Sequence, residues 1–164
     1  MRTLYLVRHA KSDWSNTSLD DFDRPLNKRG HSNAPLMGRI LREIGVEPDL
    51  IVSSPALRAI TTAQLLAKEV RYDQEKIVTD KQIYEASVKT LINVISKQPA
   101  LLKALMFVGH NPGLTAFANY ISDFDADNVP TTGVVCIQFK MDDWKNLEST
   151  TGRLVFFHYP KEFT

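Results

Sequence analysis

The clearest candidates for chemistry in this chain are Arg8 and His9, which directly follow the apolar run Leu4–Val7. A histidine side chain can act as a nucleophile that carries a phosphoryl group. A guanidinium can hold a phosphate through two parallel hydrogen bonds. The pair alone is a weak signal, because a histidine after a strand can equally be structural. Its interpretation therefore depends on what the rest of the chain supplies.

Three further residues that could bind phosphate or transfer a proton lie at the ends of other predicted elements. Arg58 lies in the opening turn of a predicted helix, His110 directly follows an apolar run, and Glu85 follows a short predicted strand. The carboxyl ends of parallel strands meet at one edge of an open α/β sheet, where such sheets place their binding sites. We therefore expect these side chains to converge with Arg8 and His9 at that edge.

This set of residues suits phosphoryl transfer. A nucleophilic imidazole must be neutral at the attacking nitrogen, so its other nitrogen needs a hydrogen-bond acceptor, often a backbone carbonyl. The transferring group carries negative charge on its oxygens, which Arg8, Arg58 and His110 would surround. A carboxyl such as Glu85 would protonate the leaving group. The positive side chains supply the field that a metal ion would otherwise provide, so we expect neither a metal nor a cofactor.

Alternating strand and helix patterns predict the elements that position these residues. The expected strands are Leu4–Val7, Leu50–Ser53, Lys76–Thr79, Ala104–Val108, Val134–Lys140 and Arg153–Tyr159. This alternation predicts an α/β three-layer sandwich, in which helices cover both faces of a mainly parallel sheet. No helix separates the last two strands, so we expect them to be antiparallel at one edge.

Capping residues predict where the helices begin and end. Asn27 is expected to cap the first helix and Gly45 to end it. Pro35 lies inside this pattern, so the helix either is kinked there or has its regular part beginning near it. Ser54-Pro55 is expected to cap and open the second helix, and Ser87 to cap the third. The polar residues 11–27 predict a long loop.

The composition bounds the class of protein. The chain has 164 residues, of which 43% are hydrophobic and 24% charged, which fits one domain over residues 1–164. A net charge of +1 gives no support for a nucleic-acid or membrane-surface partner. No run approaches the roughly 18 apolar residues of a membrane span, and a signal-peptide pattern is lacking, so a cytoplasmic location is expected. The single cysteine, Cys136, predicts a buried strand thiol.

Three motifs resemble those of the histidine phosphatase superfamily, the phosphoglycerate-mutase-like enzymes. They are Leu6-Val7-Arg8-His9-Ala10-Lys11-Ser12, Val52-Ser53-Ser54-Pro55-Ala56-Leu57-Arg58-Ala59 and Val108-Gly109-His110-Asn111-Pro112. The short length, together with the segments 21–26 and 28–30, is most similar to the small phosphohistidine phosphatase (SixA-type) branch. The resemblance covers essentially the whole chain, and the ordered combination of motifs is specific.

The resemblance implies roles for individual residues. His9 would be the phosphorylated nucleophile, with Arg8, Arg58 and His110 binding phosphate. Glu85 falls where many relatives keep their acidic proton donor. The expected substrate-binding set contains the phosphate-binding residues and three others, Ser12, Arg24 and Asn111.

The chain departs from the family pattern at two places. Ala10 stands where a glycine usually follows the histidine, a conservative change provided that the backbone there does not need a positive φ. The surroundings of Glu85 lack the fuller motif of the mutases. Asp20, Asp21 or Asp23 therefore remains an alternative proton donor.

The expected activity is that of a metal-independent phosphatase that works in two steps through a phosphohistidine on the enzyme. The resemblance suggests phosphohistidine on a protein as the substrate, and little chain remains for a lid that would exclude one. One alternative is a small-molecule phosphomonoesterase, and another, of a different class, is a phosphate-binding module without turnover. A mutase is disfavoured because the chain is too short for closing insertions. The sequence leaves the oligomeric state open.

Overall fold

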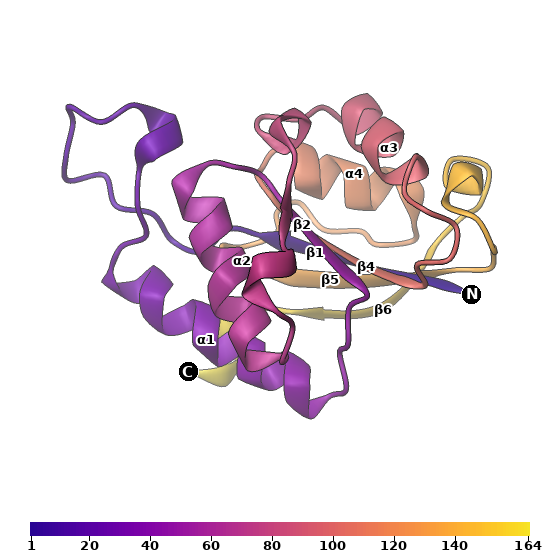
Figure 1. Cartoon of the computed structure of the whole chain (residues 1–164), viewed down its shortest axis with the longest axis horizontal. Coiled ribbons are helices and arrows are strands. Elements are labelled where there is room, and N and C mark those ends of the chain that lie inside the picture. The colour runs from indigo at the N-terminus through magenta and orange to yellow at the C-terminus, as the bar shows by residue number, and fades with distance from the viewer.

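A six-stranded mixed sheet forms the centre of the computed structural model, which describes all 164 residues (Figure 1). The strands lie in the order β3-β2-β4-β1-β5-β6. Strands β3, β2, β4 and β1 are parallel, whereas β5 is antiparallel to both of its neighbours, β1 and β6. This confirms the predicted, mainly parallel sheet with an antiparallel edge. The strand bounds are β1 Arg2–Arg8, β2 Leu50–Ser53, β3 Val78–Thr79, β4 Ala104–Gly109, β5 Val134–Phe139 and β6 Arg153–His158.

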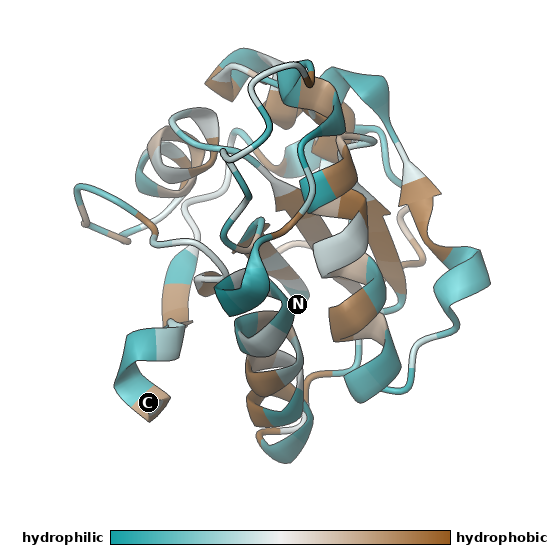
Figure 2. Cartoon of the chain, turned by 90° about the vertical axis from the view of Figure 1, so that its left-hand side faces the viewer, coloured by the Kyte–Doolittle hydropathy of each residue, from teal (hydrophilic) through white to brown (hydrophobic).

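Two helices cover each face of the sheet, as the predicted three-layer sandwich requires (Figure 1). Successive side chains of a strand point to opposite faces, so Leu4 and Leu6 join the core under α3 and α4. Tyr5 and Val7 join the core under α1 and α2. Figure 2 shows brown strands enclosed by helices that alternate between brown and teal, as expected for helices with one face on a core. The helices are α1 Lys28–Glu43, α2 Leu57–Glu69, α3 Val88–Ser96 and α4 Gly113–Ile121.

Helix α1 begins and ends at the predicted residues. The side chain of Asn27 accepts a hydrogen bond from the Gly30 N–H at 2.8 Å, which caps the first turn. Pro35 lies inside the helix, which is already regular from Lys28 and therefore does not begin near the proline. Gly45 follows the helix with a φ of 86°, in the left-handed region that favours glycine.

Helix α2 starts later than the sequence predicted. Its N-cap is Ala56, and its first residue is Leu57, rather than the expected Ser54-Pro55 start. The Ser54 hydroxyl is used in the preceding turn, where it accepts a hydrogen bond from the Ala56 N–H at 3.2 Å. Arg58 is consequently the second residue of α2, which confirms its predicted place in the opening turn.

The loop expected over residues 11–27 is present and is pinned at its base. The Asn27 N–H donates to the Lys11 carbonyl at 2.9 Å, and the Asp13 N–H donates to the Pro25 carbonyl at 2.8 Å. Between these contacts lies a short 3₁₀ turn, Asp21–Asp23. These contacts hold the two ends of the loop together at the edge of the sheet.

None of the helices has the length and apolar character that crossing a membrane requires.

Candidate active site

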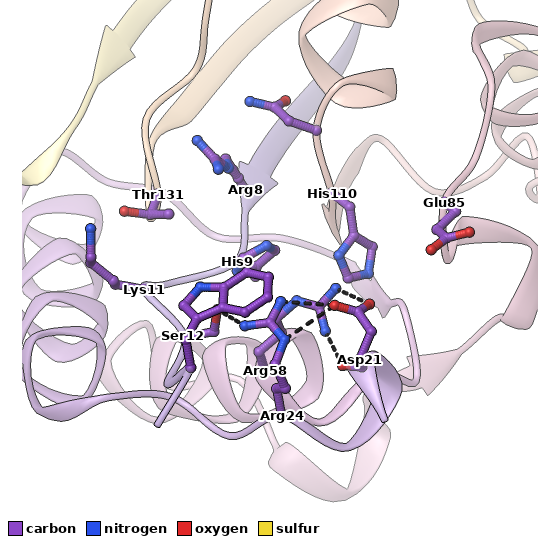
Figure 3. Close-up of a pocket in the computed structure, with 12 residues that line it drawn as sticks. Arg8, His9, Lys11, Ser12, Asp21, Arg24, Arg58, Glu85, His110 and Thr131 are labelled. Carbon is purple, nitrogen blue, oxygen red and sulfur yellow. Dashed lines mark hydrogen bonds and ion pairs between the residues drawn. The ribbon is translucent and has the colours of Figure 1, made fainter. Parts of the chain in front are cut away.

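The ends of two adjacent parallel strands bring together the two predicted histidines. Arg8 is the last residue of β1 and pairs in register with Gly109, the last residue of β4. His9 and His110 therefore leave the sheet at equivalent positions, and their ring centroids are 5.2 Å apart. Arg58 reaches the same edge from the first turn of α2 (Figure 3). The predicted convergence is confirmed.

These side chains line a pocket of about 370 Å³. Its lining residues are Arg8, His9, Lys11, Ser12, Trp14, Asp21, Arg24, Arg58, Glu85, His110, Asn111 and Thr131. All eight residues that the sequence predicted for the site are among them. The lining carries four basic side chains against two acidic ones, so it favours an anion. No group of three or more His, Cys, Asp or Glu side chains lies close enough together to hold a metal ion.

His9 is held in a single tautomer. Its Nδ1 lies 2.7 Å from the carbonyl oxygen of Ala10. A carbonyl can only accept a hydrogen bond, so Nδ1 carries the proton and Nε2 keeps a free lone pair. Burial lowers the pKa of His9 to about 4; the bond to Ala10 opposes this shift, and the charges of Arg58 and Arg8 add to it. The imidazole is therefore neutral at pH 7.

Ala10 is anchored in turn by helix α2. Its N–H donates to Thr62 Oγ1 at 2.9 Å, and the Thr62 hydroxyl donates to the Arg58 carbonyl at 2.7 Å. Ala10 is not among the residues with a positive φ, so alanine in place of the family's usual glycine strains nothing there. The sequence analysis assigned Thr62 no role. Only the fold shows that it fixes the carbonyl that orients His9.

His110 is buried with one nitrogen satisfied. Its Nε2 lies 2.7 Å from Ser54 Oγ, whereas its buried Nδ1 has no hydrogen-bond partner. Burial, together with the neighbouring His9 and the charge of Arg58, lowers the pKa of His110 to about 3. A neutral imidazole whose Nε2 accepts from the Ser54 hydroxyl carries its proton on Nδ1. It then presents a neutral donor to a ligand.

Arg8 and Arg58 are oriented by the protein and still have donors to offer. Arg8 donates through Nη1 to the Val129 carbonyl at 3.0 Å. Arg58 donates to the Asp21 carbonyl at 2.6 Å and to Asp21 Oδ2 at 2.9 Å. The Nε of each arginine is buried without a partner. Buried donors without an acceptor destabilise a protein unless a ligand or water satisfies them, so these two point to an anion site.

Asp21 is the anionic centre of the pocket. Its carboxylate receives hydrogen bonds from Arg58, from Arg24 at 2.9 Å and from the Tyr84 hydroxyl at 2.6 Å. Burial alone would raise the pKa of Asp21, but the hydrogen bonds from Tyr84, Arg24 and Arg58 outweigh it and hold that pKa far below its usual range. Asp21 is therefore ionised at neutral pH, which disfavours it as a proton donor. Asp20 and Asp23 do not line the pocket.

Arg24, which the sequence analysis expected among the substrate-binding residues, lies in the interior of the site. The residue is 6% exposed, and its guanidinium stacks on the Trp14 ring, with Cζ 3.4 Å from the ring centroid. It also donates to the Ser12 hydroxyl. The sequence shows Trp14 and Arg24 in the same polar loop, which is the one local indication that they could stack. Their stacking depends on how that loop folds back.

Glu85 lies at the margin of the pocket. It is exposed, makes no hydrogen bond or ion pair, and in Figure 3 lies beyond His110 as seen from His9. Its φ of 53° is in the left-handed region, which is uncommon for a residue other than glycine. Its neighbour Tyr84 packs edge-on against the His110 ring, with centroids 5.3 Å apart. The carboxyl is thus placed beside the second histidine.

Comparison with known proteins identifies the class. Residues 4–94 match the sequence profile of the histidine phosphatase superfamily (branch 1). An uncharacterised chloroplastic protein of Arabidopsis thaliana is 30% identical over 159 residues, a match that covers 92% of this chain and 72% of the relative. The chain therefore belongs to the histidine phosphatase superfamily, a membership that supports a phosphatase activity.

Comparison with solved structures places the chain, within the superfamily, with the SixA type. A candidate phosphohistidine phosphatase SixA from Agrobacterium tumefaciens is 28% identical with a TM-score of 0.82, covering 97% of this chain and 98% of that one. The protein histidine phosphatase SixA complexed with tungstate has the same fold, with a TM-score of 0.83 over 99% of both chains at 17% identity. The resemblance to the SixA-type branch and the phosphoglycerate-mutase-like fold, both predicted from the sequence, are thereby confirmed.

Proposed function

We propose that this protein is a metal-independent phosphatase that forms a phosphohistidine on His9 and acts on phosphohistidine in another protein. The observation that carries the proposal is the state of His9. Its Nδ1 is committed to the Ala10 carbonyl, and its neutral Nε2 is free in a pocket that contains unpaired guanidinium donors. An attacking nitrogen and a phosphate site therefore lie together.

In the first step, Nε2 of His9 attacks the substrate phosphorus, and the bond from phosphorus to the leaving nitrogen or oxygen breaks. Arg8, Arg58 and His110 hold the phosphoryl oxygens as charge moves onto the leaving group. The Glu85 carboxyl gives its proton to the leaving atom. The products of this step are the phosphorylated enzyme and the neutral leaving group.

In the second step, water attacks the phosphorus and the bond to His9 breaks. The Glu85 carboxylate takes a proton from the water as the new P–O bond forms. Inorganic phosphate leaves, and His9 returns to its neutral form with Nδ1 still bound to Ala10. The cycle therefore regenerates both His9 and the Glu85 carboxyl.

Glu85 takes the proton-transfer role because the other carboxyls are unsuitable. Asp21 is ionised and held by two arginines and a tyrosine, and Asp20 and Asp23 do not line the pocket. Glu85 is the lining carboxyl that has no cationic partner. It can therefore exchange a proton without first breaking an ion pair.

A protein substrate is supported by the exposure of the site's margin. Trp14 is 70% exposed and Glu85 is also exposed, so solvent reaches both sides of the pocket. The similarity to the candidate phosphohistidine phosphatase SixA from Agrobacterium tumefaciens supports the same substrate class. A side chain presented on the surface of another protein is the substrate that such a site favours.

The test is hydrolysis of a peptide phosphorylated on one histidine, with EDTA present, by the wild type and by His9→Ala. We expect turnover by the wild type that survives the chelator and is lost in the variant. Turnover of p-nitrophenyl phosphate but not of the peptide would favour a small-molecule phosphomonoesterase. Binding of inorganic phosphate without turnover of either substrate would favour a phosphate-binding module.

A further inference from the structure

A second pocket, of about 560 Å³, adjoins the candidate active site. It shares Glu85, His110 and Asn111 with the active-site pocket, so the two are continuous. We call it the α3–α4 pocket, because its remaining walls come from the starts of these two helices. Those walls are Ala86, Ser87, Val88, Pro112, Gly113 and Ala116.

The two pockets differ in charge. The active-site pocket carries four basic side chains, Arg8, Lys11, Arg24 and Arg58. The α3–α4 pocket contains no lysine or arginine, and Glu85 is its one carboxyl group. His110, on the shared wall, is neutral at pH 7 because burial lowers its pKa to about 3. A molecule that spans both pockets therefore has an anionic end and a neutral or cationic remainder with apolar surface.

The α3–α4 pocket is formed by rigid contacts. The Ala86 carbonyl lies so close to Gly113 that a Cβ at this glycine would clash with it. The Ser87 side chain caps α3 by accepting from the Thr90 N–H at 3.2 Å. Asn111 Oδ1 accepts from the Thr115 hydroxyl at 2.8 Å. A pocket whose walls are fixed in this way needs little reorganisation to bind a ligand.

Two features of the residues shared by both pockets favour a ligand that lies across the boundary between the pockets. His110 is 7% exposed, yet its Nδ1 has no partner within the protein. Glu85 has a left-handed backbone conformation, which brings a carboxyl without a partner to the mouth of the pocket. Backbone strain of this kind is retained where the surrounding structure holds it, often at binding sites.

We propose that the α3–α4 pocket is the leaving-group subsite and that it accepts the imidazole of a phosphohistidine together with its adjoining peptide. This rests on the phosphatase function proposed above. An imidazole has apolar faces for the pocket walls and a nitrogen that takes the Glu85 proton as the P–N bond breaks. Leaving groups that carry a carboxylate or a second phosphate are disfavoured, because the pocket has no lysine or arginine to pair with them.

Ala116 allows this subsite to be altered without touching the catalytic residues. It is exposed on α4 and lines the α3–α4 pocket but not the active-site pocket. Ala116→Trp would fill the subsite with a side chain supported by the surface of the helix. Tyr120→Trp is the matched control, because Tyr120 is 61% exposed on the same helix and lines neither pocket.

The experiment compares a peptide phosphorylated on one histidine with phosphoramidate, whose leaving group is only ammonia and leaves the subsite empty. For Ala116→Trp we expect kcat/KM on the peptide to fall by about tenfold or more, with kcat/KM on phosphoramidate unchanged within about twofold. The inhibition constant of inorganic phosphate should also stay unchanged. Tyr120→Trp should match the wild type on both substrates.

Charge complementarity is tested by Ala116→Lys. Against the wild type, this variant should lose activity on a phosphohistidine peptide with flanking lysines and gain it on one with flanking glutamates. Equal losses on peptide and phosphoramidate, or no loss on the peptide with Ala116→Trp, would overturn the subsite. A wild type that hydrolyses neither substrate would instead refute the proposed function, and the subsite proposal would fail with it.

Discussion

The Nδ1 atom of His9 donates a hydrogen bond to the carbonyl oxygen of the next residue, Ala10, at 2.7 Å. This single contact determines which nitrogen can attack a phosphorus atom, because it leaves the lone pair on Nε2. The Ala10 N–H is in turn bound to Thr62 Oγ1, so the orientation of the nucleophile depends on a buried residue of α2.

Thr62→Val should therefore impair both stability and catalysis. It keeps the shape of the side chain but removes the acceptor of the buried Ala10 N–H. Leaving that donor unsatisfied should lower the free energy of unfolding by about 1–3 kcal/mol. The kcat should fall as well, because the carbonyl that orients His9 is released. Denaturant unfolding and steady-state kinetics measure the two effects.

Thr61→Val is the matched control for that prediction. The Thr61 hydroxyl donates to the Leu57 carbonyl on the exposed side of the same helix. Its loss should change stability and kcat little. If Thr62→Val behaved like Thr61→Val, the Thr62 to Ala10 contact would have no part in orienting the nucleophile.

The free enzyme should keep His9 neutral well into the acid range. Its pKa is lowered to about 4 by burial and by the nearby arginines, against an ordinary value near 6.5. The attacking form is the unprotonated one, so it is present above about pH 4 and is lost as the pH falls through that value. NMR titration of the imidazole resonances should show no protonation of His9 between pH 8 and about pH 5.

A bound phosphate should change that titration. An anion beside His9 stabilises its protonated form, so adding inorganic phosphate should raise the pKa of His9. A titration midpoint near 6.5 in the free enzyme would contradict the burial and tautomer described for this residue.

Asp21→Asn should strengthen the binding of inorganic phosphate. The Asp21 carboxylate shares Arg24 and Arg58 with any phosphate in the pocket and repels it. Removing its charge should lower the inhibition constant of phosphate by about threefold or more. Tyr84→Phe is the control, because it removes the third hydrogen bond to Asp21 and leaves the charge in place. Weaker phosphate binding in Asp21→Asn would show that its charge is needed to orient the arginines.

Glu85→Gln should separate good leaving groups from poor ones. A proton donor matters most where the leaving group is strongly basic. The variant should therefore slow the hydrolysis of phenyl phosphate by at least about tenfold more than that of p-nitrophenyl phosphate. Equal losses on both substrates would show that Glu85 is not the proton donor and only lines the pocket.

The sequence predicted the parts of this site that follow strong local patterns. His9 and His110 come directly after apolar strands, and Arg58 comes at a helix start, so sheet topology alone brings them together. The carboxylate of Asp21 could not be assigned, because its partners depend on how the loop of residues 11–27 folds over the sheet edge. The buried stacking of Arg24 under Trp14 was missed for the same reason.

The start of α2 shows a second limit of local patterns. Ser54 has the residue type of a helix cap, but its hydroxyl accepts from the Ala56 N–H in the turn before the helix and contacts Nε2 of His110. That contact joins residues far apart in the chain. Tertiary partners of this kind leave no local signal, so the sequence could not show that Ala56, rather than Ser54, is the N-cap of α2.

The most direct test of the account is to trap the phosphorylated enzyme. The wild type is mixed with a ³²P-labelled phosphohistidine peptide, quenched with alkali within milliseconds, and digested to locate the label. The account predicts a label on the peptide that contains His9, stable to alkali and lost in acid, and absent from His9→Asn. Turnover by the wild type without any labelled enzyme, or a label that persists in His9→Asn, would contradict it.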